Sequence, residues 1–310
     1  MNTFERREFL QLIGLSAFAT SACEVQKTTV AAIRPTTGMP SKLKLSLNAY
    51  SFNDPLRAGT MSIEDLLTFC AQQNFDAVDL TGYYLPKYPV VPSDAYLYSI
   101  KNKALRLGLD FSGTGIRNDF ANPDPAKRKE DIALVKNWIA CAAKLGAPVL
   151  RIFAGNKIPD GYTWEQTAKW MVDEIKECVA YGEQHGVVVA MQNHNDFVKT
   201  AAEATHIIEA VNSAWFGLVL DIGSYRGPDP YSEIAQTTKY AVNWQLKENM
   251  YFNNVERKTD VEQIVGIIKA SGYRGYIPIE TLGAGDPKLK VPIFLAEVRQ
   301  ALQKHVGKDV

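Results

Sequence analysis

The chain has 310 residues, and 46% of them are hydrophobic, which is enough to bury one large core and excludes a disordered chain. It carries 34 lysines and arginines against 34 aspartates and glutamates, so its formal net charge at pH 7 is zero. Because this balance gives no overall field to hold a polyanion such as DNA, we expect no nucleic-acid partner.

The N-terminal stretch has the pattern of an export signal. Arg6 and Arg7 precede a mainly apolar run over residues 12–20, which contains a few small polar residues, and small residues then lead to Cys23. This order of features is typical of a twin-arginine signal peptide with a lipoprotein-type cleavage site. We therefore expect residues 1–22 to be removed, Cys23 to be lipidated, and the protein to reach the periplasm or the outer membrane. The alternative is an ordinary amphipathic helix.

Residues 23–41 have the composition of a flexible tether, rich in threonine, proline and glycine. No later stretch reaches the roughly 18 consecutive apolar residues of a membrane-spanning helix, so we expect membrane contact only through the lipid anchor. Cys70, Cys141 and Cys178 lie among apolar neighbours at irregular spacing. This spacing predicts core residues and no disulfide framework.

From residue 43 onward, strand-like segments alternate with helical ones. Short apolar runs predict strands over Leu43–Phe52, Ala77–Leu80, Leu109–Ser112, Val149–Phe153, Val187–Met191, Gly217–Asp221, Val242–Leu246 and Tyr276–Glu280. Capping residues and helical periodicity predict helices over Ser62–Asn74, Ser93–Leu107, Pro125–Leu145, Thr163–His185, Thr200–Val211, Tyr231–Thr237, Asp260–Ala270 and Ile293–Leu302.

This alternation predicts a single-domain (β/α)8 TIM barrel over residues 42–306. A doubly wound sheet is the alternative, because it also alternates strands and helices. The even spacing of the units and the lack of a glycine-rich phosphate loop after the first strand favour a closed barrel.

Polar residues follow or end most of the predicted strands. In a barrel these residues converge on one face, so side chains distant in sequence form one site. They are Asn48 and Tyr50 at the first strand, Arg151 at the fourth, Gln192 and His194 at the fifth, Asp221 at the sixth, Gln245 and Lys247 at the seventh, and Glu280 at the eighth.

Two of these strand ends are carboxylates, Asp221 and Glu280, that close otherwise apolar strands. A buried carboxylate needs a cation, a hydrogen-bond donor or a metal. Together with the amide oxygens of Gln192 and Gln245 they would form an oxygen-rich site for Mg²⁺ or Mn²⁺. The alternative is that Lys247 or Arg151 neutralises the two acids and that no metal binds.

The strand-end motifs resemble a known family. They are LNAYSF, GAPVLRIFAG, VAMQNH, LVLDIG, NWQLKE and GYRGYIPIETLG, at strands one, four, five, six, seven and eight. In order and spacing the sequence is similar to the sugar phosphate isomerase/epimerase family of xylose isomerase-like TIM barrels, over about residues 43–302. The resemblance implies a small carbohydrate substrate and leaves the oligomeric state open, with a dimer as one option.

The resemblance also implies a divalent metal, with Mn²⁺ the first choice and Mg²⁺, Co²⁺ or Zn²⁺ as alternatives. Matched by motif, its ligands would be Gln192, Asp221, Gln245 and Glu280. Gln192 departs from the family, which usually has glutamate at this position, and Ser224 stands near a common histidine position. Because glutamine cannot carry a proton at neutral pH, a mechanism with two glutamates is in doubt.

Glu280 is therefore the predicted base, with His194 or Lys247 as the acid. The alternative for His194 is a substrate-binding or supporting role, and Lys247 could instead form a salt bridge with Glu248 or Asp221. The predicted substrate-binding residues are Asn48, Tyr50, Arg151, His194 and Lys247. For Tyr83, Tyr84, Tyr88 and Trp244, stacking on a sugar ring and packing at the rim are both open.

These residues predict a metal-dependent carbohydrate isomerase or epimerase that transfers a proton next to a carbonyl. A lyase or dehydratase acting on keto-sugars or glycosides is one alternative, and a non-catalytic sugar-binding lipoprotein is another. A DNA-repair endonuclease on a related barrel is disfavoured, because the chain has zero net charge and only four histidines.

Overall fold

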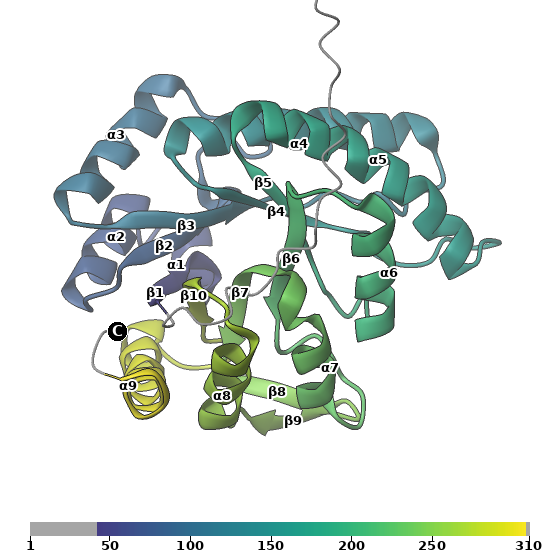
Figure 1. Cartoon of the computed structure of the whole chain (residues 1–310). Helices are drawn as coiled ribbons and strands as arrows, with labels where there is room; N and C mark the ends of the chain where they lie inside the picture. The colour runs from purple at the N-terminus through teal and green to yellow at the C-terminus, as the bar shows by residue number, and fades with distance from the viewer. Residues whose placement is uncertain (1–41, 308–310) are drawn as a thin grey trace, which may run out of the picture.

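Residues 42–307 are described by a computed structural model, in which eight parallel strands close into a barrel surrounded by helices (Figure 1). The barrel strands are β1 (Leu43–Asn48), β2 (Ala77–Thr81), β3 (Asp110–Gly115), β4 (Val149–Phe153), β5 (Val188–Gln192), β6 (Phe216–Asp221), β7 (Ala241–Lys247) and β10 (Gly275–Glu280). Around the barrel they follow the order β1, β10, β7, β6, β5, β4, β3, β2. The predicted TIM barrel is confirmed.

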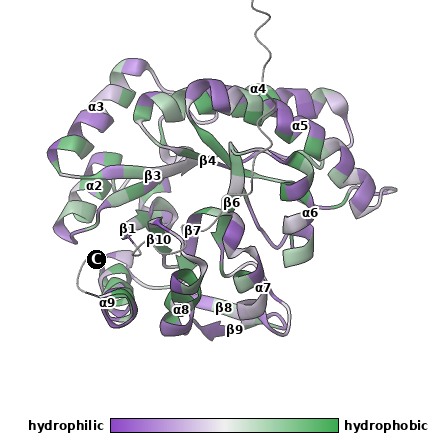
Figure 2. Cartoon of the chain, in the orientation of Figure 1, coloured by the Kyte–Doolittle hydropathy of each residue, from purple (hydrophilic) through white to green (hydrophobic). Residues whose placement is uncertain are grey.

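The helices cover the outside of the barrel. They are α1 (Asn53–Arg57), α2 (Ile63–Gln72), α3 (Asp94–Arg106), α4 (Pro125–Leu145), α5 (Trp164–His185), α6 (Ala201–Val211), α7 (Pro230–Thr237), α8 (Val261–Ser271) and α9 (Pro287–Val306), with 3-10 turns at Ala49–Phe52, Gly82–Tyr84 and Thr238–Tyr240. Ser62 and Asp260 cap α2 and α8, as predicted, and Gly186 ends α5 in the left-handed conformation. Figure 2 shows apolar and polar residues alternating along these helices, as amphipathic packing requires.

Several elements differ from the sequence prediction. The first strand was predicted to run to Phe52, but it ends at Asn48, a 3-10 turn follows over Ala49–Phe52, and the short helix α1 was not predicted. A hairpin of β8 (Asn249–Phe252) and β9 (Val255–Lys258) follows β7, with its turn at Asn253 and Asn254 in the left-handed conformation that asparagine tolerates. The final helix begins at Pro287, six residues before the predicted start at Ile293. The helix contains Pro292. Because proline is unfavourable inside a helix, the sequence predicted a start after this residue.

Side chains along each strand point alternately into the barrel and out toward the helices. On β5, Met191 joins the large core under the helices, whereas Ala190 packs with Val149 and Val219 in a small apolar cluster of its own. Gln192 follows Ala190 on the inward side, at the carboxyl end of the strand. The same alternation brings the other predicted strand-end residues to one mouth of the barrel.

No helix within residues 42–307 is long and apolar enough to span a membrane. Cys70, Cys141 and Cys178 are buried free thiols, as predicted. The predicted signal peptide, Cys23 and the tether up to residue 41 lie outside the described residues, so export and lipidation stay predictions.

Candidate functional site

A cavity of about 660 Å³ opens at the mouth formed by the carboxyl ends of the strands. Eight of the predicted site residues line it: Asn48, Tyr50, Arg151, Gln192, His194, Gln245, Lys247 and Glu280. The ninth, Asp221, is fully buried and contacts the cavity wall through Lys247 and Gln192. The size suits a small ligand, and the barrel therefore assembles the site that the strand ends predicted.

Asp221 is held as an ion by four donors. Its Oδ2 accepts hydrogen bonds from Lys247 Nζ at 2.8 Å, Gln192 Nε2 at 2.8 Å and Ser224 Oγ at 2.9 Å. Its Oδ1 accepts from the backbone N–H of Gly223 at 2.9 Å. Burial opposes ionisation of this carboxyl, but the Lys247 ammonium outweighs it and lowers the pKa of Asp221. Asp221 is therefore a satisfied, permanently charged anchor.

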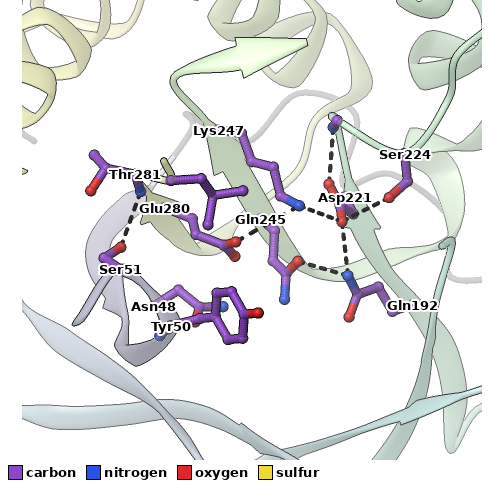
Figure 3. Close-up of polar contacts among 12 residues, drawn as sticks. Asn48, Tyr50, Ser51, Gln192, Asp221, Ser224, Gln245, Lys247, Glu280 and Thr281 are labelled. Atoms are coloured by element: carbon purple, nitrogen blue, oxygen red, sulfur yellow. Dashed lines mark hydrogen bonds and ion pairs between the residues drawn. The ribbon is translucent and has the colours of Figure 1, made fainter. Parts of the chain in front are cut away.

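Lys247 lies between the two buried carboxylates (Figure 3). Its Nζ is 2.8 Å from Asp221 Oδ2 and 3.7 Å from Glu280 Oε1, and 14% of its side chain is exposed. Burial works against the charge, yet the carboxylates of Asp221 and Glu280 raise the pKa of Lys247 above its ordinary value. The ammonium ion is thus a fixed positive charge inside the site. Of the two salt-bridge partners predicted for Lys247, Asp221 forms the pair, whereas Glu248 pairs with Lys290.

Glu280 is the second carboxylate and differs from Asp221. Only 3% of the residue is exposed, and within the described chain no donor forms a hydrogen bond with its side chain. Burial raises the pKa of Glu280 to about 7, with Lys247 acting in the opposite direction. A carboxylate with this pKa can both take and return a proton near neutral pH.

The predicted metal ligands do not fit a divalent ion well. Gln192 donates its Nε2 hydrogen to Gln245 Oε1 at 2.8 Å, so two predicted ligands bond each other (Figure 3). Asp221 has a full set of donors, and the Lys247 ammonium lies between the two carboxylates. Among residues 42–307, no group of three or more histidines, cysteines or acids is arranged to hold a metal. The metal stays a prediction, and we route no chemical step through it.

Arg151 lines the cavity from β4. Its Nη1 donates to the carbonyl of Ile116 at 2.6 Å, and its guanidinium lies 4.3 Å from the centre of the Phe153 ring. Gly115 makes this position available, since a Cβ there would lie 2.7 Å from Arg151 Nε. The contacts fix one edge of the guanidinium and leave further N–H groups for a ligand.

His194 lines the cavity beside Phe153, with ring centroids 5.1 Å apart. Its Nδ1 lies 2.7 Å from Asp196 Oδ2. Burial lowers the pKa of His194, although Asp221 and Asp196 act in the opposite direction. A neutral imidazole in this position can orient a hydroxyl group, which agrees with the substrate-binding alternative.

The remaining predicted residues divide into lining and packing positions. Asn48 lines the cavity while its Oδ1 accepts from the backbone N–H of Tyr50 at 2.9 Å, and Tyr50 is 41% exposed at the rim. Tyr83 and Tyr88 also line the cavity. Trp244 is fully buried on the outer side of β7, so of the two roles left open it has the packing role. Its neighbours on β7 point inward, and the alternation of a strand sends Trp244 outward.

Sequence reasoning missed four cationic residues that line the cavity: Arg57, Lys87, Arg117 and Arg226. Each lies in a loop or short helix that follows a barrel strand, where TIM barrels place their binding groups. Positive charges in the loops that follow the strands are the sequence signal for these four residues, whereas the predicted residues lie at or near the strand ends.

The model of the xylose isomerase-like TIM barrel family matches residues 67–300 of the chain. No curated protein matched the sequence. Among solved structures, the xylose isomerase domain protein from Planctomyces limnophilus is 12% identical with a TM-score of 0.69, covering 87% of this chain and 100% of that one.

Two further solved structures of similar fold are sugar epimerases. D-psicose 3-epimerase from Clostridium cellulolyticum H10, solved with D-tagatose, is 16% identical with a TM-score of 0.69, covering 84% of this chain and 99% of that one. The 3-keto-D-glucoside 4-epimerase from E. coli is 13% identical with a TM-score of 0.67, covering 84% and 100%. At these identities the likeness establishes the fold.

Proposed function

The chain belongs to the xylose isomerase-like TIM barrel family, and on this premise we propose that it is a carbohydrate isomerase or epimerase that transfers a proton next to a carbonyl. One observation carries the proposal: Glu280, with its pKa raised to about 7, faces the cavity 3.7 Å from the Lys247 ammonium. The sugar epimerases of similar fold support the same reaction class.

In this reaction Glu280 removes the proton from the carbon next to the substrate carbonyl. The electron pair of the broken C–H bond forms a C=C bond, and the carbonyl oxygen takes the negative charge of an enediolate. Lys247 stabilises that charge, because it is a largely buried ammonium ion held beside Asp221 and Glu280. Its raised pKa keeps it protonated, so it does not supply the free amine that an imine intermediate requires.

The hydroxyl proton on the deprotonated carbon passes to the former carbonyl oxygen, so the negative charge moves to the neighbouring oxygen. That oxygen forms the new carbonyl while the C=C electron pair takes the proton from protonated Glu280 at the former carbonyl carbon, which completes an isomerisation along one face of the sugar. Gln192 lines the same cavity at the position where the family resemblance implied a glutamate, and an amide cannot act as a second base. The site therefore supports chemistry with one base. Elimination also needs only one base, so a lyase acting on a keto-sugar is the second candidate function.

The test is proton exchange with solvent. The purified protein is incubated in D₂O with a panel of aldoses, ketoses and keto-glycosides, and deuterium at carbon is followed by NMR. We expect exchange in the wild type and a loss of at least about a thousandfold in Glu280→Gln. Glu233→Gln is the matched control, since burial also raises the pKa of Glu233 but the residue lies outside the cavity. Absence of exchange with every sugar would favour the sugar-binding alternative.

A further inference from the structure

The charge of the cavity differs from that of the whole chain. Six cationic side chains line it, and Glu280 is the single lining carboxylate: the cations are Arg57, Lys87, Arg117, Arg151, Arg226 and Lys247. The chain as a whole has zero net charge. The excess of positive charge is thus concentrated at the mouth of the barrel.

Most of these cations lack a protein counter-ion. Lys247 pairs with Asp221, but in the described part of the chain none of the other five forms an ion pair. Many exposed lysines of the barrel are paired, such as Lys136 with Glu177 and Lys258 with Glu297. Unpaired like charges around one concave surface repel one another, and they concentrate anions from solution. The cavity is therefore built to receive negative charge.

Two arginines define where that charge would lie. Arg151 is on β4, and Arg117 comes directly after β3. Their guanidinium groups lie 4.3 Å and 5.8 Å from the centre of the same Phe153 ring. In the barrel order, β4 is four strands from β10 and β3 is four strands from β7, so in this ring of eight they lie directly across from Glu280 and Lys247.

Arg151 is held for such a role without being neutralised. The Ile116 carbonyl and the open face of Gly115 fix its guanidinium, as described above. Burial raises the pKa of Asp79 to about 6, with the nearby Arg151 charge acting in the opposite direction. The Asp79 side chain accepts from Asn243 at 2.9 Å and forms no ion pair with Arg151. The guanidinium therefore keeps N–H groups for a ligand that accepts two parallel hydrogen bonds.

We propose that the substrate is an anionic sugar, carrying a carboxylate or a phosphate group that binds Arg151 and Arg117 while its carbonyl end meets Glu280 and Lys247. The proposal rests on the proposed isomerase function, because that function places the substrate carbonyl beside Glu280 and Lys247. Carboxylate and phosphate oxygens match the planar fork of arginine and carry the opposite charge, whereas a neutral sugar offers hydroxyl oxygens that accept hydrogen bonds but carry no charge.

The test measures binding by calorimetry to the full-length Glu280→Gln protein, in which turnover is blocked. The probes are matched sets: D-glucuronate and D-glucose 6-phosphate against D-glucose, and D-galacturonate against D-galactose. We expect at least one anionic probe to bind ten or more times more tightly than its neutral partner at low salt. That preference is expected to shrink in 0.5 M NaCl, and the better of the two anion types identifies the group.

Variants added to the Glu280→Gln background locate the anion site. Arg151→Gln and Arg117→Gln are each expected to reduce the preference for the anion at least fivefold. Because Arg151 is largely buried, circular dichroism checks its fold, and the exposed Arg117 keeps the test independent of folding. Arg106→Gln is the control, since it removes the same charge at the exposed end of α3.

Neutral probes that bind as tightly as the anions, or anions that do not bind, would overturn the inference. An equal loss in Arg106→Gln would also overturn it. The proposed function is read separately, from deuterium exchange by the wild type. If the wild type exchanges deuterium into neutral sugars and binds anions no better, the proposed isomerase function stands and the proposal of an anionic substrate is rejected. If an anionic sugar binds tightly but no deuterium exchange occurs, the proposed isomerase function is rejected and the protein is an anion-binding protein.

Discussion

The two buried carboxylates of the site have pKa values moved in opposite directions by their neighbours. Asp221 receives four hydrogen bonds and the Lys247 charge, which lower its pKa. Glu280 receives no hydrogen bond among the described residues and lies farther from the same ammonium, so burial dominates and its pKa rises to about 7. Paired carboxylates with separated pKa values are how active sites divide the roles of anchor and base.

The pKa of Glu280 sets the pH dependence of activity. The base must be ionised, so kcat/KM for deuterium exchange should rise tenfold per pH unit below about 7 and level off above it. The plateau should extend to alkaline pH, because the raised pKa of Lys247 preserves the ammonium. Initial rates between pH 5 and 9 measure this profile. A rate that is highest at pH 5 would exclude Glu280 as the base.

The same shift predicts the pH dependence of stability. The folded pKa of Glu280 lies above its ordinary value of 4.5, so folding favours the protonated form. This contribution is full below pH 4.5 and is lost as the pH rises through about 7. Glu280→Gln does not ionise and should gain roughly 1–3 kcal/mol of unfolding free energy over the wild type at pH 8. Urea unfolding at pH 5 and pH 8 tests this, and a gain equal at both values would contradict it.

Lys247 supplies positive charge where the sequence also allowed a metal. Lys247→Met removes the ammonium and leaves Asp221 and Glu280 as two uncompensated buried carboxylates. We expect a loss of about 3 kcal/mol in unfolding free energy, as for other buried pairs broken from one side, together with loss of exchange activity. Urea unfolding and the D₂O assay measure the two effects. Lys136→Met, which breaks the exposed pair with Glu177, should stay within about 1 kcal/mol of the wild type.

At the scale of the element, β3 is shaped to seat Arg151. Gly115 ends β3 with an ordinary backbone conformation, so the backbone accepts alanine and the nearest conflict is with the Arg151 side chain. The nearest atoms to a Cβ at this position are Arg151 Nε, Cζ and Nη2, at 2.7 to 2.8 Å. The guanidinium can move because it ends a flexible side chain, but it must then leave the Ile116 carbonyl.

Gly115→Ala should therefore affect ligand binding more than folding. We expect the affinity for the preferred anionic sugar to fall at least tenfold, while the melting temperature changes by only a few degrees. Calorimetric titration and thermal unfolding give the two values. Gly266→Ala in α8 is the control, because a Cβ there meets no atom within 4 Å. A fall in melting temperature without a change in affinity would assign Gly115 a purely structural role.

The sequence predicted the barrel at this scale because short apolar runs and capped helices leave clear local patterns. Strand β5 lies within one residue of its predicted position, and Ser62 and Asp260 cap helices as expected. The hairpin of β8 and β9 was missed, since its short strands lie outside the barrel repeat. Whether Lys247 or a metal lies between Asp221 and Glu280 depends on the distances between side chains on three different strands. The spacing of residues along the sequence does not determine those distances.

At the scale of the whole molecule, charge is distributed unevenly although it sums to zero. The cavity is cationic, so the rest of the described surface carries the compensating acids, many of them in exposed ion pairs. Such pairs contribute little to stability, whereas unpaired cations in a concave site attract anions over several ångströms. We therefore expect the arrangement to raise the local concentration of an anionic sugar at the mouth of the barrel.

The export prediction bears on which anionic sugar reaches the cavity. Outside the cytoplasm, oxidised sugars with a carboxylate are a better match than sugar phosphates, so export favours the carboxylate. Replacing Arg6 and Arg7 together by lysine should leave the precursor in the cytoplasm, whereas Cys23→Ser should abolish the lipid anchor. Cell fractionation and the mass of the mature N-terminal peptide measure both, with Arg34→Lys in the tether as the control. A mature protein that still begins at Met1 in the cytoplasm would contradict the signal and favour the phosphate.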